Sequence, residues 1–273
     1  MDIETSCGTL GHRLRAWLPV LGLGLTLTTT SAQASELVIR ERLPKALPSL
    51  PKIDEVSPSP VAGLWAVRLG GQMLYVNSDA SLLVDGQMVD LTTKANLTRG
   101  ALDKALAVDF DTLPLRDAIV TFKHGSGARR LAVFADPMCG FCRRFEPMLA
   151  QLENVTVYTY LVAMLGPQAQ DMSRRVLCAK DPSAAWSAWM LKGERPTGPA
   201  ECEAATALLE RNQALAIKLG VSGTPTTLLT DRGRLTGAVP QDALRAAVDK
   251  ADAAMAGNSS KGPKASAKVG QGG

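Results

Sequence analysis

Short strand-like runs, separated by turn residues, follow one another between residues 64 and 91. They cover 64–69, 72–76, 81–84 and 87–91, and Gly, Asn, Asp and Ser residues stand between them. Short strands joined by turns of two to four residues are typical of an antiparallel meander. The pattern predicts a small antiparallel sheet, which is expected to cover a free face or edge by pairing with a second copy of the chain.

The later part of the chain reads as a strand, a helix and a second strand. Residues 131–135 are a short apolar run that suits a buried strand, and apolar residues recur at helical spacing from Phe141 to Leu152. Residues 155–162 then alternate in the manner of a strand, which completes a β-α-β unit.

A helical block from about 168 to 219, interrupted by a loop at 193–198, follows this unit. Segments 226–230 and 234–237 predict a hairpin, and 241–255 is a last amphipathic helix. Strand, helix, strand, helical insert, hairpin and helix is the order of elements in the thioredoxin fold.

Together these patterns predict an α+β chain. A small N-terminal antiparallel-sheet dimerisation domain is expected at 35–95, a linker helix within 96–112, and a thioredoxin-like α/β domain with a helical insert at 113–255. Thr98 is the predicted N-cap of the linker helix.

Both ends of the chain differ in composition from its middle. Residues 1–34 read as a secretory signal peptide that is cleaved near Ala34, with an uncleaved membrane anchor as the alternative. Pro44 and Pro48 are expected to break a short helix that follows it. Residues 256–273 hold no aromatic residue and predict a disordered, weakly basic tail.

Composition narrows the functional classes. The chain has 273 residues, of which 46% are hydrophobic and 21% charged, so it can bury a core in two modest domains. A net charge of +4 with scattered basic residues argues against nucleic-acid binding. Cleavage would remove Cys7 and leave an even number of cysteines, which fits disulfide chemistry in an exported protein.

Cys139 and Cys142 lie where the strand at 131–135 passes into the next helix. Because a helix N-terminus favours an anion, the Cys139 thiolate is expected to be stabilised, and Cys142 is placed to attack any mixed disulfide that Cys139 forms. Half of a zinc site is the alternative, although no second close pair of thiols completes it. The motif predicts a redox pair that uses neither a metal nor a cofactor.

Thr224 and Pro225 directly precede a predicted strand, where a thioredoxin fold has a cis-proline beside its reactive disulfide. An ordinary trans proline at the start of an edge strand is the alternative. A cis-proline would leave the Thr224 backbone free to pair with an extended segment, which predicts a polypeptide substrate.

Cys178 and Cys202 belong to no Cys-x-x-Cys motif. They are predicted to form a structural bridge that pins the helical insert, with a second redox pair as the alternative. Asp136 is interpreted as a turn former rather than a proton carrier. A Cys-His hydrolase that uses His124 is a further alternative for the reactive cysteine.

With these motifs in place, the mature chain resembles the bacterial periplasmic disulfide isomerases of the DsbC/DsbG family. The segments that carry the resemblance are 60–63, 134–136, 139–142, 178–181, Cys202 and 220–225. The family implies a V-shaped homodimer that is joined through its N-terminal sheets. It also implies residue roles: Cys139 as nucleophile, Cys142 as resolving thiol, Thr224 and Pro225 as the substrate-side loop, and Cys178–Cys202 as a non-catalytic disulfide.

The resemblance further implies misoxidised exported proteins as substrates and a membrane thiol reductase of the DsbD type as the partner that keeps the pair reduced. Phe141 stands where the family usually has Tyr, and the Gly140-Phe141 spacer is closer to the isomerase branch. The predicted function is therefore a periplasmic disulfide isomerase. The alternatives are a dedicated thiol reductase for one partner, and a DsbG-like reductase or chaperone.

Overall fold

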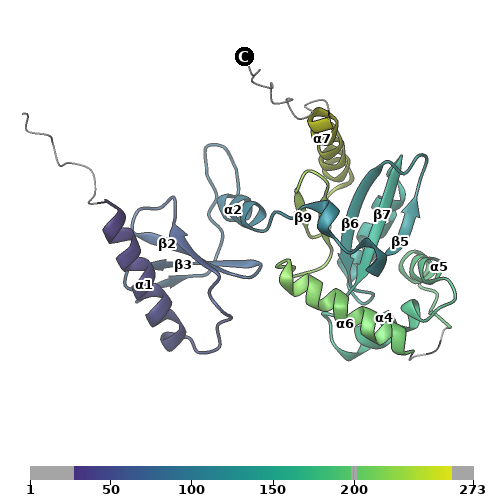
Figure 1. Cartoon of the computed structure of the whole chain (residues 1–273), viewed down its shortest axis with the longest axis horizontal. Coiled ribbons are helices and arrows are strands. Elements are labelled where there is room, and N and C mark those ends of the chain that lie inside the picture. Colours follow the sequence, from purple (N-terminus) through teal and green to yellow (C-terminus); the bar gives the residue numbers. More distant parts are fainter. Residues whose placement is uncertain (1–27, 198, 200–201, 260–273) are drawn as a thin grey trace, which may run out of the picture.

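The computed structural model of the chain describes residues 28–197, 199 and 202–259, and Figure 1 shows two sheet-containing units with helix α2 between them. Residues 1–27 of the predicted signal peptide and the predicted tail from residue 260 onward lie outside the described residues. Helix α7 (Gln241–Ser259) includes 256–259, so the start of the predicted tail is helical. Within the described part of the chain, no helix has the length and apolar character needed to cross a membrane.

The N-terminal unit is an antiparallel sheet in the order β1-β2-β3-β4. Its strands are β1 (Glu55–Pro58), β2 (Leu64–Leu69), β3 (Gln72–Asn77) and β4 (Leu83–Val84). The hairpin of β2 and β3 confirms the prediction. The predicted strand at 87–91 is wrong, because the Asp90 side chain accepts N–H bonds from Thr92 and Thr93 and turns the chain. Strand β1 was not predicted, since it is short and ends in proline.

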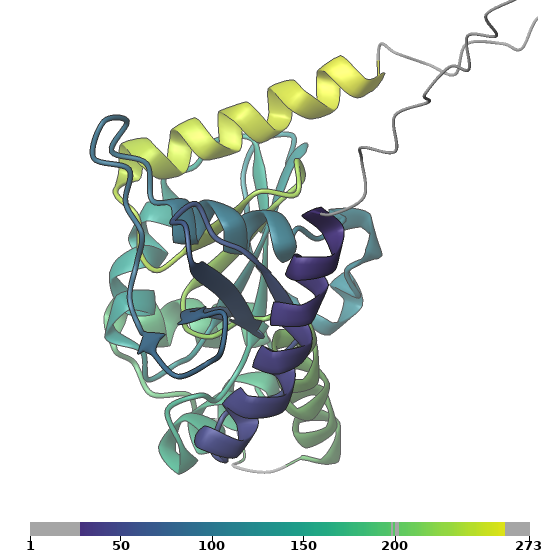
Figure 2. The ribbon, with the colours of Figure 1, turned by 90° about the vertical axis from the view of Figure 1, so that its left-hand side faces the viewer.

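Helix α1 (Thr28–Ala46) lies across one face of this sheet (Figures 1 and 2). Its Ile39 and Leu43 are buried in one core with Val67 of β2. The helix includes the predicted cleavage site at Ala34 and continues through Pro44, so the expected break at Pro44 is wrong. Burial of the apolar face outweighs the single hydrogen bond that proline removes near a helix end.

The linker helix α2 (Leu97–Ala105) begins at Asn96, whose side-chain oxygen accepts a hydrogen bond from the Arg99 N–H. The predicted N-cap at Thr98 is therefore wrong. Thr98 is buried, and its hydroxyl lies 2.5 Å from the Tyr75 hydroxyl in a hydrogen bond. Asn and Thr both suit an N-cap, and the tertiary contact of Thr98 decides between them.

The C-terminal unit is built on a sheet in the order β5-β7-β6-β8-β9. Its strands are β5 (Ile119–Lys123), β6 (Arg129–Ala135), β7 (Val155–Leu161), β8 (Thr226–Leu229) and β9 (Arg234–Thr236). Strands β6 and β7 are parallel, and the other neighbours are antiparallel. The predicted β-α-β unit and hairpin are confirmed, and with them the thioredoxin order.

Helices cover both faces of this sheet. Besides α7 they are η1 (Phe110–Thr112), η2 (Leu115–Asp117), α3 (Gly140–Ala150), α4 (Pro167–Leu177), α5 (Pro182–Ser187), the π-helix η3 (Ala188–Lys192) and α6 (Glu203–Lys218). Leu131 and Val133 of β6 enter the core formed with α3, α5 and α7, whereas Ala132 and Phe134 enter the core formed with α6 and η1. Strand β6 is thus buried on both faces and gives the turn that follows it a rigid base.

Candidate active site

The turn from β6 into α3 positions both cysteines of the Cys-x-x-Cys motif. Cys139 is the N-cap of α3 and Cys142 lies in its first turn, as predicted. Both are free thiols, and the Cys142 backbone N–H donates a hydrogen bond to Cys139 Sγ at 3.4 Å. The N-terminus of α3 therefore presents a backbone donor to the first sulfur.

The loop before β8 brings Thr224 to the same sulfur. The Thr224–Pro225 peptide bond is cis, as predicted. The Cys139 thiol donates a hydrogen bond to the Thr224 carbonyl oxygen at 3.3 Å, although the two residues are 85 positions apart in the sequence. The fold thus brings together Cys139, Cys142, Thr224 and Pro225.

Burial distinguishes the two thiols. The exposed fraction is 1% for Cys142 and 7% for Cys139. Burial raises the pKa of the Cys142 thiol far above its usual value, and the neighbouring Cys139 sulfur raises it further. Cys142 is therefore the inner, protonated thiol of the pair.

Asp136 organises the loops around the cysteines. It is fully buried, and its Oδ1 accepts the Met138 N–H at 2.8 Å, which confirms the predicted turn. Its Oδ2 accepts the N–H groups of Met164 and Leu165 at 2.7 and 3.0 Å. Burial nevertheless raises the pKa of this carboxyl above its ordinary value. Asp136 thereby fixes the loop after β7 beside the cysteine loop.

Exposed apolar side chains lie on the two loops that Asp136 joins. Met138 and Phe141 flank Cys139 in the sequence, and Met164 and Leu165 follow β7. Each of the four is at least 39% exposed. Sequence reasoning missed Met164 and Leu165, because no motif marks them and only the contacts of Asp136 place them here.

Glu146 is a buried acid that sequence reasoning also missed. It lies four residues after Cys142 on α3, on the same helix face, and is 2% exposed. Its Oε1 accepts a hydrogen bond from Trp186 Nε1 at 2.8 Å, and burial raises its pKa to about 7. The helical insert therefore packs directly against the helix that carries the cysteines.

A second tryptophan links the insert to the cysteine loop. Trp189 Nε1 donates a hydrogen bond to the Pro137 carbonyl oxygen at 2.7 Å. The Arg143 guanidinium lies over the Trp189 ring at 4.6 Å from its centroid. The insert therefore holds the segment just before Cys139 from the outside.

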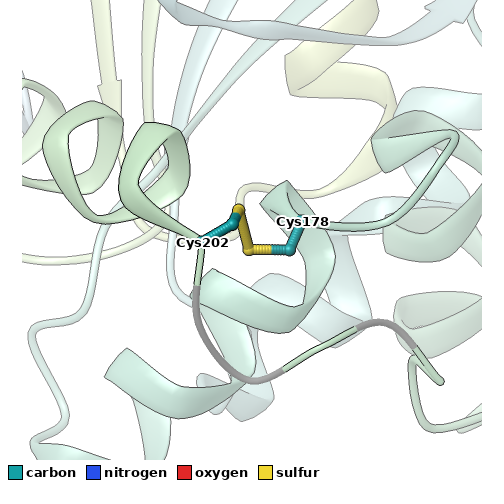
Figure 3. Close-up of a disulfide and its surroundings, with 2 residues drawn as sticks. All are labelled: Cys178 and Cys202. Carbon is teal, nitrogen blue, oxygen red and sulfur yellow. A yellow bond between two sulfur atoms is a disulfide. The ribbon is translucent and has the colours of Figure 1, made fainter.

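A disulfide joins Cys178 and Cys202 (Figure 3), as the sequence predicts. Cys178 is the C-cap of α4 and Cys202 the N-cap of α6, so the bridge ties two helices of the insert across 24 positions. A bond that closes such a loop restricts the unfolded chain and stabilises the insert.

The surroundings of the cysteines and of His124 bear on the metal and histidine alternatives. In the described ranges, no group of three or more His, Cys, Asp and Glu side chains is arranged to hold a metal ion. His124 forms a hydrogen bond through Nδ1 with the Leu152 carbonyl oxygen at 2.8 Å, and its ring packs against Phe122. Its contacts thus lie at the β5 end rather than at the thiols.

The fold and the site define a class of protein. A Cys-x-x-Cys pair at the N-terminus of the helix that follows a central strand, beside a cis-proline loop, is the arrangement of a thioredoxin-fold thiol-disulfide oxidoreductase. Two family profiles match the chain: a "Disulfide bond isomerase protein N-terminal domain" over residues 30–99 and a "Thioredoxin-like domain" over residues 115–252.

Individual relatives agree with these profiles. The probable thiol:disulfide interchange protein DsbC of Bordetella avium is 40% identical over 230 residues, which cover 83% of this chain and 80% of that protein. The thiol:disulfide interchange protein DsbC of Escherichia coli K12 is 27% identical over 225 residues, 80% of this chain and 89% of the relative. The chain belongs to the DsbC family of thiol:disulfide interchange proteins.

Among solved structures, the disulfide interchange protein from Neisseria gonorrhoeae is similar to part of the chain. It is 30% identical, with a TM-score of 0.46, and the match covers 51% of this chain and 98% of that one.

Proposed function

We propose that the protein is a periplasmic disulfide isomerase, which rearranges or reduces incorrect disulfides in exported proteins. The observation that carries this proposal is the contact of the Cys139 thiol with the Thr224 carbonyl oxygen at the N-terminus of α3. Membership of the DsbC family and the match of the first domain to the N-terminal domain of disulfide bond isomerases support it. Export is inferred from the predicted signal peptide that is cleaved near Ala34.

The reaction begins with Cys139. Its thiolate attacks one sulfur of a substrate disulfide, the substrate S–S bond breaks, and the other substrate sulfur leaves as a thiolate. The N-terminus of α3 and the Cys142 N–H favour negative charge at the attacking sulfur. The product of this step is a mixed disulfide between Cys139 and the substrate.

The mixed disulfide can be resolved in two ways. A second substrate thiolate attacks the substrate sulfur and expels the Cys139 thiolate, which rearranges the disulfide without net electron transfer. Alternatively, Cys142 loses its proton and attacks Cys139 Sγ, which releases a reduced substrate thiol and forms a Cys139–Cys142 disulfide. Because Cys142 is buried and protonated, its attack on Cys139 is slowed, and rearrangement by a substrate thiolate is favoured.

Thr224 and Pro225 form the substrate side of the site. The carbonyl oxygen of Thr224 already accepts a hydrogen bond from the Cys139 thiol. Once that proton is lost, the backbone of Thr224 is free to pair with an extended substrate strand next to the reacting sulfur. Oxidised pairs are returned to the dithiol by a membrane thiol reductase of the DsbD type, which supplies the two electrons.

We further propose that two copies join through the N-terminal sheet. Strand β4 is the edge of that sheet, and an edge strand leaves backbone donors and acceptors unpaired. Leu82, Leu83 and Val84 at this edge are 68%, 39% and 51% exposed. An edge with exposed apolar side chains fits a second copy of the same edge.

Replacing Val84 with lysine is expected to convert the dimer to a monomer, as measured by light scattering at matched concentration, because a charge at the edge opposes strand pairing. Val61→Lys is the matched control, since Val61 has a similar exposed fraction, 48%, but lies between β1 and β2. The isomerisation rate of the monomeric variant is expected to be about tenfold lower than that of the dimer, because a monomer offers a substrate one binding site in place of two linked sites. An unchanged dimer in Val84→Lys would contradict this edge as the interface.

The function itself is tested with a scrambled multi-disulfide protein. Catalytic amounts of the reduced mature protein are expected to restore native disulfide pairing and enzymatic activity of that substrate. Free thiols are counted in the same samples, so that isomerisation is separated from net reduction. Accumulation of fully reduced substrate without recovery of its activity would identify a dedicated thiol reductase instead.

A further inference from the structure

The two domains meet at a small contact directly before the Thr224–Pro225 bond. We call it the interdomain junction, and it consists of residues 70–71, Leu106, residues 220–222 and Arg234. A Cβ added to Gly71 would stand 2.2 Å from the Gly220 carbonyl oxygen, and Ser222 Oγ donates to the Gly71 carbonyl oxygen at 3.5 Å. The turn between β2 and β3 therefore touches the catalytic domain backbone to backbone.

The linker helix reaches the same point. Leu106 is the C-cap of α2, and a Cβ added to Gly220 would lie 2.7 Å from Leu106 Cδ2. Gly220 has a φ of +62°, which favours glycine, and it follows the end of α6. Gly220 is thus in contact with the N-terminal sheet on one side and with the linker on the other.

Arg234, on β9 of the catalytic domain, forms hydrogen bonds with the ends of both helices that meet at the junction. It is 8% exposed and donates hydrogen bonds to the carbonyl oxygens of Leu219 at 2.6 Å, Leu106 at 3.2 Å and Gly220 at 3.4 Å. Leu106 and Leu219 are the C-caps of α2 and α6. One guanidinium therefore binds the C-terminal ends of two helices, where the helix dipole favours a cation.

The contact is local. A cavity of about 350 Å³ adjoins the junction and is lined from both domains, for example by Gln72, Arg99 and Thr236. Space around the junction leaves the two domains room to rotate if the junction opens.

The junction is also next to the active site. Ser222 is two residues before Thr224, whose carbonyl oxygen accepts a hydrogen bond from the Cys139 thiol. On the other side, Thr226 at the start of β8 pairs with Thr236 of β9, the strand that carries Arg234. The segment that holds the N-terminal domain is thus continuous with the substrate-side loop.

We propose that the interdomain junction holds the catalytic domain at a fixed orientation on the N-terminal domain, and that isomerisation requires this orientation whereas reduction of a small disulfide does not. Arg234 is its positioning residue. The proposal rests on the proposed dimeric isomerase, because the orientation of the domains matters only where two active sites face one shared polypeptide. A small disulfide needs only Cys139 and Cys142, which β6 and α3 hold independently of the junction.

The test compares full-length Gly71→Ala with Gly86→Ala. A Cβ at Gly71 meets the Gly220 backbone, whereas a Cβ at Gly86, which lines the same cavity, meets nothing within 4 Å. Amide hydrogen exchange of residues 219–224 is measured by mass spectrometry, together with isomerisation of a scrambled protein and reduction of a small aromatic disulfide. Arg234→Lys is the second variant, since it keeps the charge but replaces the planar guanidinium, whose Nη1 binds the Gly220 carbonyl oxygen and whose Nη2 binds those of Leu106 and Leu219, with a single nitrogen.

In Gly71→Ala and Arg234→Lys, exchange at 219–224 is expected to rise at least about fivefold, since open amides exchange faster. Isomerisation is expected to fall about tenfold while small-disulfide reduction stays within about twofold of the unmodified protein, and Gly86→Ala should match that protein throughout. Unchanged exchange, or faster exchange with unchanged isomerisation, overturns the proposal. If the unmodified protein itself fails to isomerise, the proposed function has failed, and the exchange comparison still decides whether the junction closes.

Discussion

Replacing Cys139 with alanine is expected to abolish both reduction and isomerisation, with a loss on the order of 10³-fold, because the attacking thiolate is removed. Cys142 cannot take over its role. It is 1% exposed, and burial raises the pKa of its thiol far above the usual value, so that it stays protonated and out of reach of a protein disulfide.

Cys142→Ala is the matched control for this result. It leaves the Cys139 contact with Thr224 in place and removes only the resolving thiol. Mixed disulfides with substrate are expected to accumulate in this variant and to be visible by non-reducing electrophoresis, since their release then depends on a substrate thiol. Equal activity of Cys139→Ala and the unmodified protein would show that the first cysteine is not the nucleophile.

Replacing Glu146 with glutamine is expected to stabilise the protein at alkaline pH. Burial raises the pKa of the Glu146 carboxyl to about 7, from 4.5 in the unfolded chain. Between pH 4.5 and pH 7 the unfolded chain loses this proton while the folded protein keeps it, so stability falls as the pH rises through that window. The difference in pKa corresponds to a loss of about 3 kcal/mol that is complete above pH 7.

Glutamine removes the titration but keeps an oxygen that can accept the Trp186 hydrogen bond. Urea unfolding of the dithiol form is measured at pH 4.5 and pH 8, with the Cys178–Cys202 disulfide intact. The two proteins are expected to be equally stable at pH 4.5, and Glu146→Gln to be more stable by about 3 kcal/mol at pH 8. Glu210→Gln, the same substitution at an exposed position on α6, is the matched control. The same stability difference at both pH values would show that Glu146 does not titrate in this window.

The elements whose pattern is local were predictable. The alternating pattern or apolar run that predicted strands β2, β3, β6 and β7 matches strands of the structure. The position of Cys139 at a helix N-terminus likewise follows from the few residues around it. The N-cap error arose where two local choices were close in energy. Asn96 and Thr98 both suit an N-cap, and the hydrogen bond of Thr98 with Tyr75 decides between them.

The sequence by itself predicted the Cys-x-x-Cys pair and the Thr224–Pro225 loop, because each is a short motif, and the order of the thioredoxin elements, because local periodicity marks each element. The bridge between Cys178 and Cys202, 24 positions apart, was predicted because neither cysteine belongs to a Cys-x-x-Cys motif. Only the tertiary structure decided that Asp136 binds the loop of Met164 and Leu165, that Glu146 meets Trp186, and that Arg234 joins two helix ends. These contacts depend on burial and on partners far along the chain. Burial is a property of the packed molecule rather than of any stretch of sequence. It raises the pKa of a carboxyl, and it brings a guanidinium within hydrogen-bond distance of several carbonyl groups.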